Sequence, residues 1–127
     1  MNLYSLFEHS DNVQEFQAGA TIFSEGAPGE VMYVVLNGIV ELRIQGALIE
    51  IVGPGEIIGE MALIDSASRS ASAMAKSDCR LAAVDAQQFL FMVQQAPLFS
   101  LHVMQVLVDR LRRMDIEWSC AHTEPKG

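Results

Sequence analysis

The sequence predicts a mainly β protein, an eight-stranded β-roll or jelly-roll barrel with a short N-terminal helix and two C-terminal helices. Short apolar or alternating runs recur from residue 12 to residue 84, and turn-forming residues, mostly glycine, stand at almost every junction between them. After Asp85 the apolar spacing becomes helical. The chain has 127 residues, and 50% of them are hydrophobic, which is enough for one domain with a buried core.

The expected elements follow in order from the N-terminus. Residues 2–9 are expected to form the short helix. Asn37-Gly38 is the strongest short hairpin signal in the chain, so a hairpin is expected there. The runs that are expected to form strands cover residues 13–17, 21–24, 31–36, 38–45, 47–52, 56–58, 70–75 and 79–84.

Two helices are expected after the strands. Asp85 is placed to cap the first, and Pro97 begins a second, longer one. The apolar residues of the longer helix form two stripes. One stripe is expected to pack on the barrel, and the other is expected either to face a partner subunit or to belong to one broad buried face of a monomer. The first stripe of the second helix contains Leu101, Met104, Leu107 or Val108, Leu111 and Trp118, and the second contains Phe99, Val103 and Val106.

The whole arrangement is expected to be a single domain. It covers residues 1–118, with the β-roll at about 12–84, the C-terminal helices at about 85–118 and a flexible tail at 119–127. The N-terminus lacks a cationic region and a long apolar run, so it is not expected to be a signal peptide. Glutamines interrupt the longest uncharged stretch, so no membrane span is expected.

Charge and composition exclude several functions. The net charge of −8 repels nucleic acid and anionic lipid, so neither nucleic acid nor a membrane is expected as a partner. Cys79 and Cys120 form no CxxC pair, which favours a reduced, cytoplasmic setting. The three histidines are scattered and no nucleophile has a base at a recognisable spacing, so no metal site and no catalytic residue are expected.

The segment from Gly59 to Ser70, GEMALIDSASRS, carries the strongest functional signal. Arg69 is the only cation between Arg43 and Lys76, and it lies among small residues. A guanidinium in such a setting needs an anionic partner, and it can bind a phosphate through two hydrogen bonds. Backbone N–H groups at a helical start after Gly59 would add to the phosphate site. The nearby Glu60 would repel the anion, unless it accepts hydrogen bonds from hydroxyls of the same ligand, as a sugar phosphate provides.

These residues resemble the phosphate-binding cassette of the cyclic nucleotide-binding domains, in which Gly-Glu-x-Ala-Leu, a short loop and Arg-Ser/Ala/Thr-Ala follow in order. The resemblance covers nearly the whole chain, and it implies cAMP or cGMP as the ligand without any further cofactor. It implies that Glu60 binds the ribose 2′-OH and that Arg69 binds the cyclic phosphate. It also implies backbone contacts from Gly59, Met61 and Ala62, and a contact of Ser70 with the phosphate or the purine.

The resemblance has departures and open ends. Ser68 replaces the proline that many eukaryotic members carry before the arginine. DNA-binding members continue into a helix-turn-helix domain about where this chain ends, so a stand-alone sensor domain is expected. The long helix covers the base in many members. The residues placed by position to contact the base are Arg110, Met114, Asp115 and Trp118.

The sequence thus predicts a non-enzymatic cyclic nucleotide sensor that signals by movement of its C-terminal helices. Its output would be a protein partner in trans or a homodimer through the C-terminal helix. The alternative is a structural or dimerisation module of the same fold with a vestigial site. An enzyme on a cupin-like barrel ranks lower, because the expected strands contain no histidine for a metal.

Overall fold

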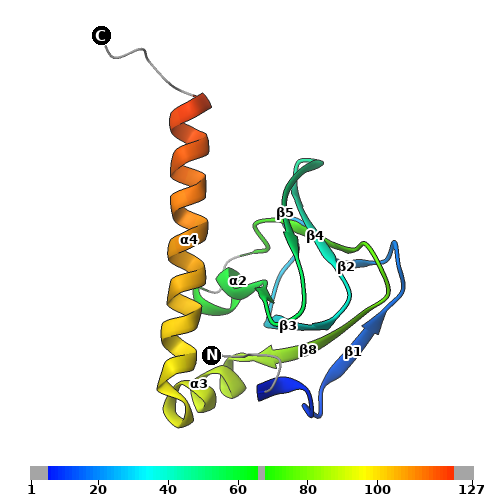
Figure 1. Cartoon of the computed structure of the whole chain (residues 1–127), viewed down its shortest axis with the longest axis vertical. Helices are drawn as coiled ribbons and strands as arrows, with labels where there is room; N and C mark the ends of the chain where they lie inside the picture. Colours follow the sequence, from blue (N-terminus) through cyan, green and yellow to red (C-terminus); the bar gives the residue numbers. More distant parts are fainter. Residues whose placement is uncertain (1–5, 66–67, 122–127) are drawn as a thin grey trace. The chain divides into compact units, whose positions relative to one another are not determined.

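The computed structural model describes residues 6–65 and 68–121 (Figure 1). The side chains of Ala62, Ile64, Asp65 and residues 113–121 lie outside this description. The predicted fold class is confirmed, because the described chain is mainly β, with eight strands in two antiparallel sheets and helices at the C-terminal end. Of the expected N-terminal helix, residues 6 and 7 are helical, and residues 1–5 lie outside the described part.

The observed strands match the expected runs to within about two residues at each end. They are β1 Val13–Phe16, β2 Thr21–Phe23, β3 Val31–Asn37, β4 Val40–Ile44, β5 Ala47–Val52, β6 Ile57–Ile58, β7 Ser72–Ala75 and β8 Cys79–Asp85. The helices are α2 Glu60–Asp65, α3 Ala86–Gln95 and α4 Pro97–Ala121. The first sheet has the order β1-β8-β3-β6 and the second the order β2-β7-β4-β5.

The core lies between the inner faces of the two sheets. Tyr33 and Val35 of β3 pack in one buried cluster with Val40 of β4, Ala73 of β7 and Leu81 of β8. β3 is buried along most of its length, because it lies inside the first sheet and pairs with both β6 and β8. Its apolar run therefore lacks the alternation of apolar and polar residues that is typical of a strand with one solvent-exposed face. This core positions the segment that follows β6, which carries the candidate site.

The prediction of a hairpin at Asn37-Gly38 is wrong. β3 pairs with β6 and β8, whereas β4 pairs with β5 and β7, so the chain crosses from one sheet to the other at Gly38. Gly38 has φ +92°, and a Cβ there would collide with the Asp78 carbonyl oxygen and lie 2.7 Å from Cys79 Sγ. The glycine therefore serves a close approach of two chain segments rather than a hairpin turn.

The hairpin in this region lies one strand later. β4 and β5 pair directly, and Gln45 and Gly46 between them have φ values of +50° and +82°. Two consecutive positive φ values are the mark of the type I′ turn that suits the twist of a hairpin. Asn-Gly is the preferred sequence for this turn, and the chain uses Gln-Gly. The turn lies at the glycine between the expected strands 38–45 and 47–52.

The start of α3 confirms the expected aspartate cap. The Gln88 backbone N–H donates to Asp85 Oδ1 at 2.8 Å, and the Asp85 backbone N–H donates to Gln88 Oε1 at 3.0 Å. This reciprocal pair is a capping box that satisfies two backbone donors at the helix start. α4 begins at the expected Pro97 and continues to Ala121, so the residues expected at the start of the tail are helical. Residues 122–127 lie outside the described part.

The chain divides into two compact units, one of residues 2–90 and one that contains residues 91–127. In the second unit, Phe99 and Val103 of α4 are buried. The exposed apolar residues of α4 are Leu98, Leu101, Met104, Val108 and Leu111. Of the second predicted stripe, Phe99 and Val103 are buried and Val106 is partly buried, whereas Leu101, Met104, Val108 and Leu111 of the first stripe are exposed. The side chain of Trp118 lies outside the described part. In the described residues no single helix is long and apolar enough to cross a membrane, and only the bent pair α3–α4 passes by length and composition together.

Candidate functional site

The backbone of Arg69 is fixed by the loop between β2 and β3. The Gly26 N–H donates to the Arg69 carbonyl oxygen at 2.8 Å, and the Arg69 N–H donates to the Ala27 carbonyl oxygen at 2.8 Å. These two hydrogen bonds fix the position of the Arg69 backbone beside the loop. The sequence reasoning placed no contact in this loop, so its support of Arg69 was missed.

The Arg69 side chain is buried, with 6% of its surface exposed. Its Nη1 atom donates a hydrogen bond to the Gly59 carbonyl oxygen at 3.1 Å, and its guanidinium carbon lies 4.2 Å from the centroid of the Phe23 ring. Its Nε atom is buried without a hydrogen-bond partner among the described residues. Part of the guanidinium is therefore anchored, and another part is left with an unused donor.

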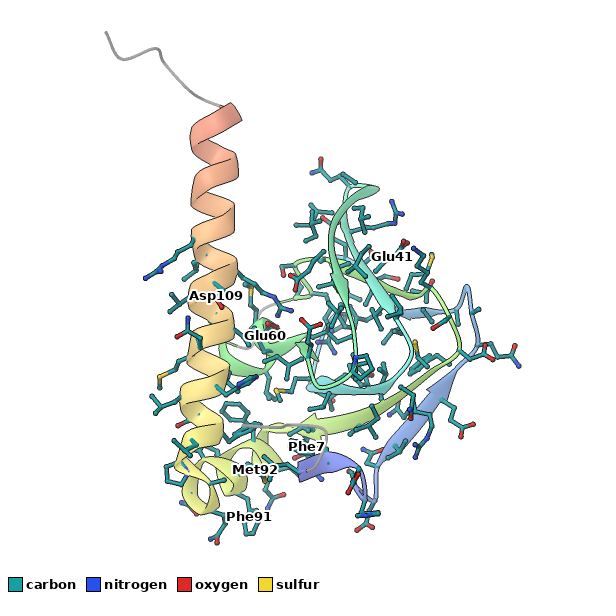
Figure 2. The ribbon with its side chains drawn as sticks, viewed as in Figure 1. Phe7, Glu41, Glu60, Phe91, Met92 and Asp109 are labelled. Atoms are coloured by element: carbon teal, nitrogen blue, oxygen red, sulfur yellow. The ribbon has the colours of Figure 1, made fainter. Side chains whose placement is uncertain are left out.

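Glu60 is the other buried charged side chain. It is the first residue of α2 and is 3% exposed. Figure 2 labels it at this short helix. In the described part of the chain, the buried charged side chains are Glu60 and Arg69. These are the two residues to which the sequence assigned the sugar and the phosphate. Because burying a charge is costly, two such groups ten residues or fewer apart favour a site with a purpose other than stability.

The charge of Arg69 is not neutralised by a carboxylate of the described residues. The ion pairs recorded there join Glu8 to His9, and Glu41 to Arg43 and Lys76. Burial lowers the pKa of Arg69, and the neighbouring Tyr33 opposes this shift. An arginine nevertheless stays protonated at neutral pH, because its ordinary pKa is so high. The site therefore holds a buried positive charge whose best partner is an anion.

Gly59 is required by the arginine itself. Its φ is +77°, and a Cβ there would lie 2.5 Å from Arg69 Nη1 and 3.4 Å from Phe23 Cε2. The sequence interpretation gave this glycine to the close approach of a ligand. The structure gives it a further reason, because the Arg69 guanidinium occupies the space that a side chain at Gly59 would need.

The other predicted contact residues of this segment are Met61, Ala62 and Ser70. Ser70 is exposed, and its hydroxyl lies 3.7 Å from Met61 Sδ, so the two ends of the segment meet. Ala62 is in α2, and its side chain is not described. α2 has six residues, so its dipole is small, and Arg69 supplies most of the local positive charge.

The four predicted base contacts are not tested. Arg110 is a partly buried residue of α4, and the side chains of Met114, Asp115 and Trp118 lie outside the described part. α4 belongs to the unit of residues 91–127, whereas the segment around Arg69 belongs to the other unit. These four residues therefore stay predictions.

A column of three aromatic rings beside Arg69 was missed by the sequence reasoning. Phe23 stacks on Tyr33, with centroids 6.2 Å apart and an angle of 16° between the ring planes. Tyr33 in turn meets Phe16 edge to face, at 6.5 Å and 88°. Phe23 and Tyr33 belong to different sheets, and strand periodicity does not predict which rings meet across two sheets.

The described residues include no group of three or more His, Cys, Asp or Glu side chains that could hold a metal ion. The segment from Gly59 to Ser70 offers one buried cation, one buried carboxylate, and hydroxyl and backbone groups for contacts with a ligand. Arg69 can bind an anionic group such as a phosphate, and a carboxylate such as Glu60 can accept hydrogen bonds from hydroxyl groups.

The comparison with known families agrees with this chemistry. The family model described as the cyclic nucleotide-binding domain matches residues 13–96, which include every strand and the whole segment from Gly59 to Ser70. The chain belongs to this family. The resemblance seen in the cassette residues is thereby confirmed.

Two relatives match most of this chain. The cyclic nucleotide-binding chain is 36% identical to the cyclic AMP receptor protein of Thermus thermophilus over 107 residues, which cover 80% of this chain and 50% of that protein. It is 30% identical to a CRP-like cAMP-activated global transcriptional regulator of Mycobacterium tuberculosis over 104 residues, covering 78% of this chain and 46% of the regulator. The chain thus spans about half the length of these relatives.

Solved structures share the fold. The crystal structure of the Thermus thermophilus catabolite activator protein has a TM-score of 0.78 and 33% identity, over 87% of this chain and 54% of that one. The EAL enzyme Bd1971 in its cGMP-bound form has a TM-score of 0.65 and 39% identity, over 84% of this chain and 30% of the enzyme. Its cAMP-bound form has a TM-score of 0.62 and 37% identity, over 86% of this chain and 31% of the enzyme.

Proposed function

We propose that this cyclic nucleotide-binding domain binds cAMP or cGMP at residues 59–70 and acts as a sensor without catalytic activity. The observation that carries the proposal is the pair of buried charged side chains, Glu60 and Arg69, in the matched part of the chain. The similar cGMP-bound and cAMP-bound forms of the EAL enzyme Bd1971 support the ligand class.

The anchoring of Arg69 suggests how the phosphate would be held. The side-on edge of a guanidinium pairs Nε–H with one N–H of the Nη atom on the same side, and this fork fits two oxygens of a phosphate. Nη1 is engaged with the Gly59 carbonyl, and Nε is without a protein partner among the described residues. We therefore assign the Nε edge of Arg69 to the two exocyclic oxygens of the cyclic phosphate.

The other roles follow from the same geometry and from family membership. Glu60 accepts a hydrogen bond from the ribose 2′-OH, which explains a carboxylate in an anion site. Ser70 donates its hydroxyl to the phosphate or lies against the purine, and Gly59, Met61 and Ala62 offer backbone contacts. The choice between cAMP and cGMP is assigned to α4, through Arg110, Met114, Asp115 or Trp118.

The signal is proposed to leave through the C-terminal helices, because ligand binding can act only if it favours one helix position over another. The exposed stripe of α4 suggests the recipient. Leu101, Met104, Val108 and Leu111 follow the 3-4-3 spacing of a coiled-coil seam, which favours a second copy of this chain. The same stripe also favours the alternative of a dimerisation module with a vestigial site, so ligand binding must be measured.

Calorimetric titration of the protein with cAMP and cGMP tests the proposal. At a ligand concentration one hundred times Kd, a true site raises the free energy of unfolding by about 2.7 kcal/mol, which thermal unfolding detects. Adenosine and acyclic 5′-AMP serve as controls for the phosphate and its ring. The absence of both binding heat and thermal shift with either cyclic nucleotide would leave the dimerisation module as the better function.

The cytoplasmic setting stays a prediction from the separated cysteines.

A further inference from the structure

The buried charge of Arg69 is balanced in an unusual way. A buried arginine is ordinarily paired with a carboxylate, but the ion pairs recorded among the described residues do not include Arg69. Besides the Gly59 carbonyl oxygen, the group that stabilises this charge is the π face of Phe23, with the guanidinium carbon 4.2 Å from the ring centroid. This distance is within the range of a cation–π interaction, which is stronger when the cation is desolvated, as it is here.

Phe23 itself is held by its neighbours. It stacks on Tyr33, which meets Phe16 edge to face, so the ring under the guanidinium is the end of an aromatic column. Phe23 and Tyr33 both lie against the buried core. A ring packed in this way loses little freedom when it contacts the arginine, so the orientation of the guanidinium is defined by the core.

We infer that Phe23 is a positioning residue that holds the Arg69 guanidinium ready for the phosphate before the ligand arrives. This inference rests on the proposed function. A carboxylate in the same place would neutralise the charge and compete with the phosphate for its N–H donors. An aromatic face attracts the cation but accepts none of the N–H donors at the guanidinium edge, so these donors stay available to the ligand.

Two restraints then act on one guanidinium. Its carbon lies over the Phe23 ring, and the Gly59 carbonyl oxygen accepts from Nη1 at 3.1 Å. The space at Gly59 is shared by both partners, because a Cβ there would lie 2.5 Å from Nη1 and 3.4 Å from Phe23 Cε2. A long side chain that is already fixed loses less conformational freedom on binding, so preorganisation appears as ligand affinity.

The test compares two substitutions of Phe23 with a control on the same strand. Phe23→Leu keeps an apolar side chain but removes the π face, and it is expected to weaken binding of the cyclic nucleotide by about tenfold. Phe23→Tyr keeps the ring and is expected to stay within about twofold of the wild type. Ile22→Val trims a neighbouring residue of β2 that packs on the same core, and it is expected to leave the affinity unchanged.

The outcomes separate positioning from general packing. Tenfold weaker binding for Phe23→Leu with recovery in Phe23→Tyr supports the inference. Equal affinity of Phe23→Leu and wild type overturns it, and so does an equal loss of affinity in Ile22→Val. Calorimetry on the intact chain gives the affinities, and thermal unfolding without ligand shows that each variant is folded.

A double-mutant cycle in the absence of ligand tests the contact without relying on the proposed function. Phe23→Leu, Arg69→Met and the double variant are compared with the wild type by urea unfolding. The expected result is that Phe23→Leu lowers stability less in the Arg69→Met background, because the contact is already gone. Additive effects would contradict the inference even if cyclic nucleotides bind. If the wild type binds neither nucleotide, the proposed function fails, and a non-additive cycle still supports the contact.

Discussion

The Nη1 atom of Arg69 donates to the carbonyl oxygen of Gly59 at 3.1 Å, and a Cβ atom on Gly59 would lie 2.5 Å from the same nitrogen. The first residue of the predicted motif is thus packed against its arginine ten positions later. The spacing of the motif therefore reflects an internal contact of the protein as well as contacts with a ligand. Gly59 therefore has two roles that can be tested separately. Its backbone adopts a positive φ, and its missing side chain leaves space for the arginine.

Gly59→Ala is expected to weaken cyclic nucleotide binding by at least about tenfold, the range of one charge-assisted hydrogen bond. The methyl carbon would lie 2.5 Å from Nη1, which is too close for an unshifted contact, and would push the guanidinium away from its anchored position. A positive φ also strains alanine by roughly 1–2 kcal/mol, so stability falls as well. Calorimetry measures the affinity, and urea unfolding measures the stability.

Gly46→Ala is the matched control for this change. Gly46 has φ +82°, and nothing lies within 4 Å of a Cβ placed there. The control is therefore expected to lose stability through backbone strain while keeping the affinity of the wild type. A similar loss of affinity in both variants would show that destabilisation, and not the displaced guanidinium, weakens binding.

Arg69→Lys is expected to lower the affinity by about tenfold or more, because an ammonium group keeps the charge but lacks the planar fork for two phosphate oxygens. Lysine also lacks the guanidinium that lies over Phe23. The control is Arg80→Lys, since Arg80 is an exposed residue that donates to Asn37 Oδ1 at 3.0 Å. Unchanged binding in Arg69→Lys would show that charge alone suffices and would remove the bidentate contact from the mechanism.

Local sequence signals predicted most of the fold. Apolar runs bounded by turn residues located all eight strands, and an aspartate before a helical pattern located the start of α3. The segment from Gly59 to Ser70 was located because a cation among small residues and a carboxylate after a glycine are chemically unusual. These features depend on residues close together in the chain, where propensity and spacing act directly.

Contacts between distant residues could not be predicted in the same way. Asn37-Gly38 has the composition of a hairpin turn, yet the approach of Asp78 and Cys79 sets the conformation there. The placement of Phe23 under Arg69 depends on how two sheets pack, and single-strand periodicity contains no such information. No local pattern indicated that the loop residues Gly26 and Ala27 hold the arginine backbone, because this contact joins segments more than forty residues apart.

Glu60→Gln tests the assignment to the ribose hydroxyl. The amide keeps the shape of the side chain but removes a charged acceptor, so affinity for cAMP or cGMP is expected to fall by about tenfold or more. The 2′-deoxy nucleotide lacks the hydroxyl, and its affinity is expected to change little between wild type and variant. Equal losses for both ligands would contradict the ribose contact. Glu56→Gln is a control with the same chemical change in an exposed glutamate whose Oε1 accepts from the Gly53 N–H at 2.9 Å.

Stability is expected to fall in alkaline solution. Burial raises the pKa of Tyr33 above its ordinary value of 10.0, an effect that Arg69 opposes, and burial raises the pKa of Cys79 above 9.0. The unfolded chain therefore releases these protons at lower pH than the folded protein. Stability from these groups is complete below the unfolded pKa values and is lost as the pH rises through the folded ones.

Tyr33→Phe isolates the contribution of the phenol. The ring contacts with Phe16 and Phe23 are kept, but the titrating proton is removed, so the free energy of unfolding is expected to decline less steeply above about pH 10. The remaining decline would include Cys79. Urea unfolding at several alkaline pH values measures both slopes, and parallel curves for wild type and Tyr33→Phe would show that the phenol does not contribute.

Leu101→Lys tests whether the exposed stripe of α4 joins two copies of the chain. Leu101 is 60% exposed and lies in the 3-4-3 series with Met104, Val108 and Leu111. The wild type is expected to sediment as a dimer and Leu101→Lys as a monomer, because a charge at a seam position must lose water on association. Asp109→Lys places the same group next to the stripe, on a residue whose Oδ1 accepts from Gln105 Nε2 at 2.9 Å, and it is expected to stay dimeric. A monomeric wild type would contradict self-association, and a partner of another sequence would then be the candidate for this stripe.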